Sequence, residues 1–156
     1  MDTARTNLSS AESVVSRIER AVAVLVRRAE SIRQAQPEPE QLLRSAYLLL
    51  AELERRGPMG VAALANSMEL DVSTVSRQVI PLDQQGLVHR LSNPNDGRMS
   101  VIEITPEGVT QLTRTRDRRH AVYADILQDW SADDRAALAS YLERLNASAA
   151  RIQNQT

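Results

Sequence analysis

The chain of 156 residues contains no cysteine and only two histidines, His89 and His120. It therefore forms no disulfide, thiolate metal site or iron–sulfur cluster, and we expect no metal and no cofactor. Apolar runs such as Ala46–Ala51 are far shorter than the roughly 20 residues that cross a bilayer. The polar start Met1–Ser10 also lacks a signal-peptide hydrophobic region. These absences predict a cytoplasmic protein that does not contact membranes.

The chain also has little net charge. It carries 19 basic residues, all arginine, against 20 acidic ones, for a formal net charge of −1. Such a balance ordinarily argues against nucleic acid as a partner, because DNA binding requires cations that face phosphates. Hydrophobic residues make up 42% of the chain, enough to build a packed core. The length fits one compact domain or two small lobes.

Helical patterns dominate the N-terminal part. Apolar residues from Val15 to Ile32 recur every three or four positions and predict a helix over about Ser10–Gln34, with Ser9 as its N-cap. The two prolines that follow should end this helix. A leucine-rich stretch then predicts a more deeply buried helix over about Pro39–Arg56, which Gly57 should terminate.

The middle of the chain changes pattern twice. Two short helices are predicted over Val61–Met68 and Val72–Gln85, separated by a tight turn. After Gly86 the apolar residues alternate with period two, which predicts strands over Leu87–Leu91 and Met99–Ile104. The turn-rich segment between them indicates a β-hairpin.

Two further helices are predicted after the hairpin, with Thr105 and Ser131 as their N-caps. The segment Thr113–His120 has no apolar residue, as in a helix that bridges two lobes across solvent. The predicted fold is mainly α with a small β-hairpin wing. We divide it into an N-terminal helix at 1–38, a winged lobe at 39–105 and C-terminal helices at 106–156.

The segment from Asp71 to Gln84 has the pattern of a DNA-recognition helix. Asp71 can cap it, and Val72, Val75, Val79 and Leu82 fall on one face, which we expect to be buried. Ser73 and Arg77 fall on the opposite face, and Thr74, Ser76 and Gln78 lie on the flanks. Short hydroxyl side chains let a helix approach the major groove, and an arginine can bind guanine O6 and N7. An ordinary amphipathic surface helix fits this segment alone equally well.

The order and spacing of these motifs resemble the MarR family of transcriptional regulators over about Ser10–Arg151. The matching residues are Gly57-Pro58-Met59, Leu64-Ala65, the Ser73–Arg77 run, Leu82, Gly86-Leu87-Val88, Arg90, Pro94, Asp96, Arg98, Ile104-Thr105 and Gly108. The resemblance implies a homodimer formed by the terminal helices, with two winged lobes on a palindromic operator in double-stranded DNA. It also implies that Arg98 reaches the minor groove and that Asp96 holds an arginine in place. The implied DNA-contacting residues are Ser73, Thr74, Ser76, Arg77, Gln78, Arg90, Asp96 and Arg98.

Three departures from the family pattern bear on this interpretation. Pro81 lies inside the second short helix, beyond its base-reading turns, and should bend that helix or remove a hydrogen bond from it. Glu69 stands where the turn of the motif usually has glycine, and a left-handed residue there costs about 1 kcal/mol, which favours an adjusted turn. Gly97 stands where many relatives have another arginine, so this wing has one cation fewer. Residues 58–105 hold three arginines, Arg77, Arg90 and Arg98, against five acidic residues.

The resemblance thus implies a ligand-responsive repressor, with a small-molecule effector whose binding residues are unknown. A winged-helix protein-interaction module without specific DNA binding is the alternative. Tyr47 either lines an effector pocket or belongs to the core. The arginine-rich segment Arg114–Arg119 fits either a solvated face with local ion pairs or contacts to flanking phosphates. No catalytic triad, phosphate-binding glycine loop or carboxylate pair indicates an enzyme.

Overall fold

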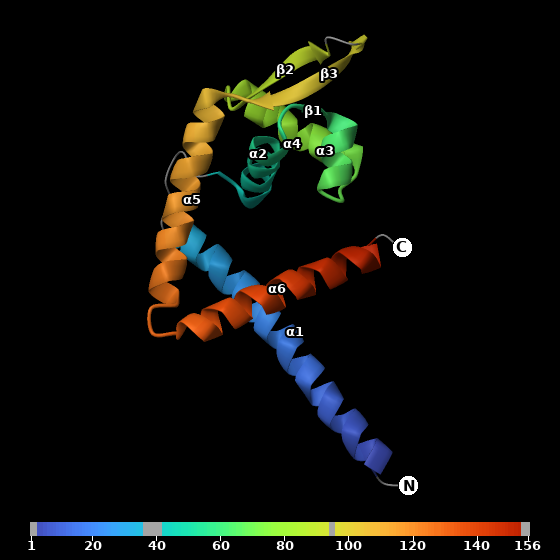
Figure 1. The fold of residues 1–156 in the computed structure, drawn as a ribbon, viewed down its shortest axis with the longest axis vertical. Helices are drawn as coiled ribbons and strands as arrows, with labels where there is room; N and C mark the ends of the chain where they lie inside the picture. Colours follow the sequence, from blue (N-terminus) through green and yellow to red (C-terminus); the bar gives the residue numbers. More distant parts are fainter. Residues whose placement is uncertain (1–2, 36–41, 94–95, 154–156) are drawn as a thin grey trace. The chain divides into compact units, whose positions relative to one another are not determined.

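The computed structural model describes residues 3–35, 42–93 and 96–153, with side chains described for 13–32, 42–91 and 101–152. It is mainly helical with one small sheet, which confirms the predicted fold class (Figure 1). Its elements are α1 (Thr3–Ala35), α2 (Arg44–Arg56), β1 (Met59–Gly60), α3 (Val61–Ser67), α4 (Val72–Gln84), β2 (Val88–Asn93), β3 (Asp96–Ile104), α5 (Pro106–Ile126) and α6 (Ala132–Gln153). The chain divides into two units, 1–41 and 42–156, which are described separately.

The first unit contains α1, which is longer than predicted. It begins at Thr3, so Ser9 lies inside the helix and the predicted N-cap at Ser9 is wrong. No glycine or proline interrupts the segment before Ala35, and residues such as Ala4 and Leu8 have high helix propensity. The predicted apolar stripe is largely solvent-exposed, at Val15, Ile18, Val22, Leu25 and Ile32, and the neighbouring Val14 and Val26 are exposed as well.

The second unit is built around α2. This helix starts at Arg44, later than predicted, because Leu43 has an extended backbone. Residues 39–41 lie outside the described residues. The helix ends as predicted at Gly57, which has φ +83° and donates its N–H to the Leu53 carbonyl at 2.9 Å. The core around it consists of Leu42, Leu49, Leu50, Leu53, Leu64, Ala65, Val75, Val79, Leu82, Leu87, Val88, Ile102 and Leu112.

Helices α3 and α4 form the predicted helix-turn-helix. Glu69 in the turn has φ +55°, so the turn keeps a left-handed residue and the expected adjustment is wrong. The cost of about 1 kcal/mol is offset by local hydrogen bonds, including that from the Leu70 N–H to the Ala65 carbonyl at 3.0 Å. Helix α4 continues across Pro81 to Gln84, although Pro81 offers no N–H to the Arg77 carbonyl.

The wing is a β-sheet with one strand more than predicted. Strands β2 and β3 form the expected antiparallel hairpin, and both are longer than the sequence pattern indicated. The added strand β1 pairs with β3 on its other edge, with Met59 opposite Ile102, giving the order β1-β3-β2. A strand of two residues has no alternation to detect, so only its pairing with β3 defines it.

The start of α5 is fastened to the wing. Thr105 accepts from the Gly108 N–H at 2.9 Å, which confirms the predicted N-cap, and donates to the Gly86 carbonyl at 2.7 Å. A Cβ at Gly108 would lie 2.1 Å from the Leu87 carbonyl oxygen. Glycine is therefore required for the helix to approach this backbone so closely.

Helix α6 begins at the second predicted cap. The Ser131 hydroxyl accepts from the Asp134 N–H at 3.1 Å and donates to the Asp134 carboxylate at 2.6 Å. The apolar positions Tyr141, Leu142, Leu145 and Ile152 are exposed on this helix, as are Tyr123 and Ile126 near the end of α5.

Candidate nucleic-acid interface

Helix α4 presents nearly the two faces that its sequence predicts. Val75, Val79 and Leu82 are buried in the core, whereas Ser73 and Arg77 are exposed. The flanking residues Thr74, Ser76 and Gln78 are half-buried. Val72 was expected on the buried face but is 49% exposed, because it occupies the first helical position, before the helix reaches the core. The exposed face therefore begins at the N-terminal end of α4.

A dense hydrogen-bond network occupies that end of α4. The Asp71 carboxylate accepts from the Thr74 N–H at 2.7 Å, which confirms the predicted cap. It also accepts from the Ser73 hydroxyl at 2.5 Å and from the Thr74 hydroxyl at 2.6 Å. The hydrogen bonds from Ser73, then those from the Thr74 side chain and backbone, hold the pKa of Asp71 far below its usual range. Asp71 is therefore ionised whenever the chain is folded near neutral pH.

Arg77 lies next to this network. Its Nη2 atom is 3.4 Å from Thr74 Oγ1, at the long limit of a hydrogen bond, and the side chain is otherwise exposed. A guanidinium held this loosely can exchange its contact for a base or a phosphate. Gln78, one residue further along, differs, because its Oε1 atom is buried and has no hydrogen-bond partner among the described residues.

The cations expected on the wing are described only in part. Arg90 on β2 has its Nε atom 3.6 Å from Asp83 Oδ2 on α4, and both side chains are about two-fifths exposed. Asp96 and Arg98 belong to β3 by backbone, but their side chains lie outside the described residues. Arg77 and Arg90 are thus both exposed and both near a carboxylate or a hydroxyl of the same lobe.

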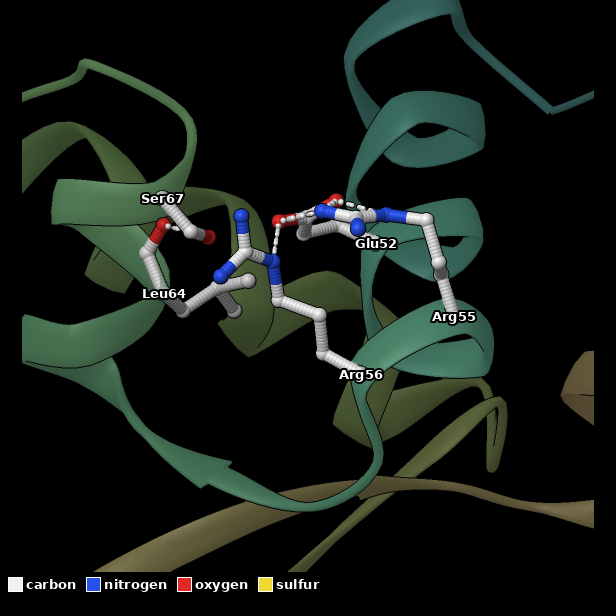
Figure 2. A network of polar contacts seen from close by, with 5 residues as sticks. All are labelled: Glu52, Arg55, Arg56, Leu64 and Ser67. Atoms are coloured by element: carbon white, nitrogen blue, oxygen red, sulfur yellow. Dashed lines mark hydrogen bonds and ion pairs between the residues drawn. The ribbon is translucent and has the colours of Figure 1, made fainter.

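A polar cluster that sequence reasoning did not anticipate joins α2 to α3 (Figure 2). The Glu52 carboxylate lies 2.9 Å from Arg55 Nη2 and 2.5 Å from Arg56 Nε. Burial opposes ionisation of Glu52, but the hydrogen bond from Arg55, the polar side chain of Ser67 and the charges of both arginines lower its pKa overall. The Ser67 hydroxyl donates its one proton to the Leu64 carbonyl at 2.9 Å. The ion pairs of Glu52 lie within α2 and the hydrogen bond of Ser67 lies within α3, so the cluster brings the polar groups of both helices together.

A second cluster joins α2 to the middle of α5. Arg116 Nη2 lies 2.6 Å from Glu54 Oε2, and the Arg119 guanidinium stacks 4.0 Å from the centre of the Tyr47 ring. The hydrogen bond to Glu54 is the main cause of a raised pKa for Arg116. Tyr47 itself is half-buried and packs against the core. Two of the arginines in the basic segment of α5 thus make contacts with α2.

Two other kinds of site, a membrane span and a metal centre, are absent from the described ranges. No helix there is long and apolar enough to span a bilayer. No group of three or more histidine, aspartate or glutamate side chains in those ranges is placed to hold a metal ion.

A helix-turn-helix followed by a β-hairpin, with an exposed polar face on its second helix, defines a winged-helix DNA-binding lobe. The model of the MarR family matches residues 42–100, which span this lobe. A HTH-type transcriptional regulator from Bacillus subtilis, YxaD, is 36% identical over 135 residues, covering 86% of this chain and 94% of its own. This chain therefore belongs to the MarR family, which consists of transcriptional regulators and not of enzymes.

Solved structures share the fold. A MarR mutant from E. coli complexed with operator DNA has a TM-score of 0.70 at 17% identity, covering 84% of this chain and 94% of its own. The PcaV regulator from Streptomyces coelicolor, in complex with its natural ligand, has a TM-score of 0.67 at 23% identity, covering 82% and 91%.

Proposed function

We propose that this MarR-family regulator binds a palindromic operator as a homodimer, with helix α4 of each subunit in the major groove. The observation that carries the proposal is the exposed N-terminal face of α4, where Ser73, Thr74 and Arg77 lie together beside Asp71. Ser76, Gln78 and Arg90 border this face, and we assign Asp96 and Arg98 to the same interface by their place in the wing. The E. coli MarR structure that shares the fold contains operator DNA, which supports this mode of binding.

The exposed apolar surfaces of α1 and α6 support the homodimer. Val15 is 64% exposed, and Tyr141 and Ile152 are 62% and 68% exposed. Large contiguous apolar surfaces on a water-soluble chain mark interaction sites. We infer that a second copy of the chain covers each of these surfaces.

We further propose that the protein is a repressor that a small ligand releases from DNA. PcaV, which shares the fold, was crystallised with its natural ligand. A ligand that favours one separation of the two lobes would shift the population away from the arrangement that fits successive major grooves, about 34 Å apart. The ligand and its binding residues are not assigned.

The decisive experiment selects bound sequences from random DNA with the full chain and measures their affinity by fluorescence anisotropy. Recovery of a palindrome, bound far more tightly than scrambled DNA, is expected. If all three arginines of each subunit met phosphates, six contacts would give a log–log salt slope of about −5, and Arg77 reading a base instead makes the slope shallower. Absence of any enriched sequence would contradict the proposal.

A protein-interaction module is the second candidate, favoured by one observation. The winged segment 58–105 holds only three arginines against five acidic residues, and Arg90 already lies near Asp83. In that case DNA binding would be absent or insensitive to salt, and the selection would return no consensus.

A further inference from the structure

The hydroxyl groups of Ser73 and Thr74 both donate their proton to one acceptor, the Asp71 carboxylate. The two oxygen–oxygen distances are 2.5 and 2.6 Å, short as expected for hydrogen bonds to an ionised group. An ionised carboxylate carries no proton, so the hydrogen in each bond must come from the hydroxyl. The direction of both hydrogen bonds is thus fixed by chemistry.

This arrangement limits what the two hydroxyls can offer to DNA. A hydroxyl has one proton to donate and two lone pairs with which to accept. Since the proton of each hydroxyl is already engaged in a hydrogen bond to Asp71, Ser73 and Thr74 present only lone pairs to an approaching partner. Thr74 already accepts from Arg77 in this way, at 3.4 Å.

The major groove contains groups that fit such acceptors and groups that do not. Adenine N6 and cytosine N4 are amino donors, whereas guanine O6 and N7, thymine O4 and the phosphate oxygens only accept. Two hydroxyls that cannot donate therefore gain a hydrogen bond from adenine or cytosine alone. The negative charge of Asp71 adds a repulsion toward phosphate.

We propose that Asp71 is a specificity-determining positioning residue: it fixes Ser73 and Thr74 as hydrogen-bond acceptors and thereby selects bases with an exocyclic amino group at the positions they face. Arg77, which has only donors, is the complementary reader and suits guanine. The accepting hydroxyls and the donating guanidinium lie on one helical turn. Neighbouring base pairs are therefore distinguished by whether they offer a donor to Ser73 and Thr74 or an acceptor to Arg77. This inference rests on the proposed function, because it requires α4 to enter the major groove.

The first test uses the unaltered protein and modified DNA. In the selected operator, each adenine is replaced in turn by purine, which lacks the N6 amino group, and each cytosine by 2-pyrimidinone, which lacks N4. We expect at least one position per half-site to lose about two- to tenfold in affinity, the value of one neutral hydrogen bond. The same replacements outside the half-sites serve as the control for duplex stability and should have no effect.

The second test uses Asp71→Ser. Serine is also a good N-cap and can accept from the Thr74 N–H. Its single hydroxyl cannot replace the carboxylate, which accepts two further hydrogen bonds from Ser73 and Thr74. We expect this variant to keep its fold, shown by an unchanged circular dichroism spectrum. It should lose the preference for adenine or cytosine over thymine or guanine at these positions, because the released hydroxyls can then donate to O4, O6 or N7 as well as accept from an amino group.

Two matched variants separate this effect from others. Asp83→Asn removes a carboxylate of the same lobe that does not contact the hydroxyls, and should change affinity for all sequences alike. Ser131→Ala removes the cap of α6 and should lower stability without changing base preference. If either variant abolished the discrimination as Asp71→Ser does, the effect would be one of charge or stability and the inference would be wrong.

Failure of the inference differs from failure of the proposed function. If the selection returns a site and Arg77→Ala relaxes its preference, yet no amino deletion weakens binding, only the role of Asp71 is overturned. If the protein selects no sequence at all, both are overturned.

Discussion

The guanidinium of Arg116 on α5 lies 2.6 Å from the carboxylate of Glu54 on α2, across 62 positions of sequence. The neighbouring Arg119 stacks on Tyr47 of the same helix α2. Because the middle of α5 has no apolar side chain, these polar contacts supplement the buried Leu112 in holding α5 against α2. The sequence left two interpretations of the segment Arg114–Arg119 open, and in the structure two of its arginines, Arg116 and Arg119, contact α2.

Glu54→Gln should weaken this link only modestly. The Arg116 side chain is 43% exposed and the Glu54 side chain 33%. Ion pairs with this exposure to solvent contribute less than about 1 kcal/mol to the free energy of unfolding. A double-mutant cycle with Arg116→Gln in urea, at low and high salt, measures the coupling. A coupling energy that is zero at low salt would show that the ion pair does not hold the helices together.

Arg77→Ala should relax base preference at one position of each half-site. If Arg77 makes a bidentate contact with guanine, its loss costs about 1 to 3 kcal/mol of binding free energy at that position. Anisotropy titrations against the operator and its single-base variants measure the change. Arg135→Ala, on α6 and outside the winged lobe, is the matched control. Unchanged affinity and unchanged preference in Arg77→Ala would remove α4 as the recognition helix.

Asp83→Asn should strengthen binding to DNA of any sequence. Arg90 then loses its neighbouring carboxylate at 3.6 Å and becomes available to phosphate. Each added phosphate contact steepens the log–log salt slope by about 0.9. Asp129→Asn, between α5 and α6, removes the same charge outside the winged lobe. If both variants changed the slope equally, net charge and not Arg90 would be responsible.

Gly108→Ala should destabilise the fold much more than a typical surface substitution. The added methyl group would meet the Leu87 backbone oxygen at 2.1 Å, so α5 or the wing must shift. Overpacking of this kind costs about 1 to 3 kcal/mol. Gly57→Ala is the comparison, because its methyl group meets nothing within 4 Å and only the backbone at φ +83° is strained. Urea unfolding of both variants tests whether close packing or backbone strain dominates.

Acid should remove the contribution of Asp71 to stability. Its pKa in the folded chain lies below the unfolded value of about 3.9, so the ionised carboxylate stabilises the fold above that pH. This contribution is lost as the pH falls toward the folded-state pKa. We expect the difference in unfolding free energy between the native chain and Asp71→Ser to be constant near neutral pH and to shrink below about pH 4. A difference that grows on acidification would have the wrong sign.

Much of the fold follows from contacts between residues close in sequence. The caps at Asp71, Thr105 and Ser131 involve partners three positions away, and the faces of α4 follow from helical periodicity. These features were predictable because a helix repeats every 3.6 residues whatever surrounds it. The start of α1 was misplaced, since no breaker marks it and capping residues such as serine also occur inside helices.

The sequence by itself determined the winged helix-turn-helix order, the capped helices and the residues on the exposed face of α4. Only the tertiary structure decided the pairing of β1 with β3, the link between Glu54 and Arg116, and the approach of Arg90 to Asp83. These contacts join distant segments, so no periodicity encodes them. The fixing of Ser73 and Thr74 as acceptors depends on both sequence and structure. Asp71 is close to them in sequence, yet only the side-chain geometry shows that its one carboxylate accepts a hydrogen bond from both hydroxyls.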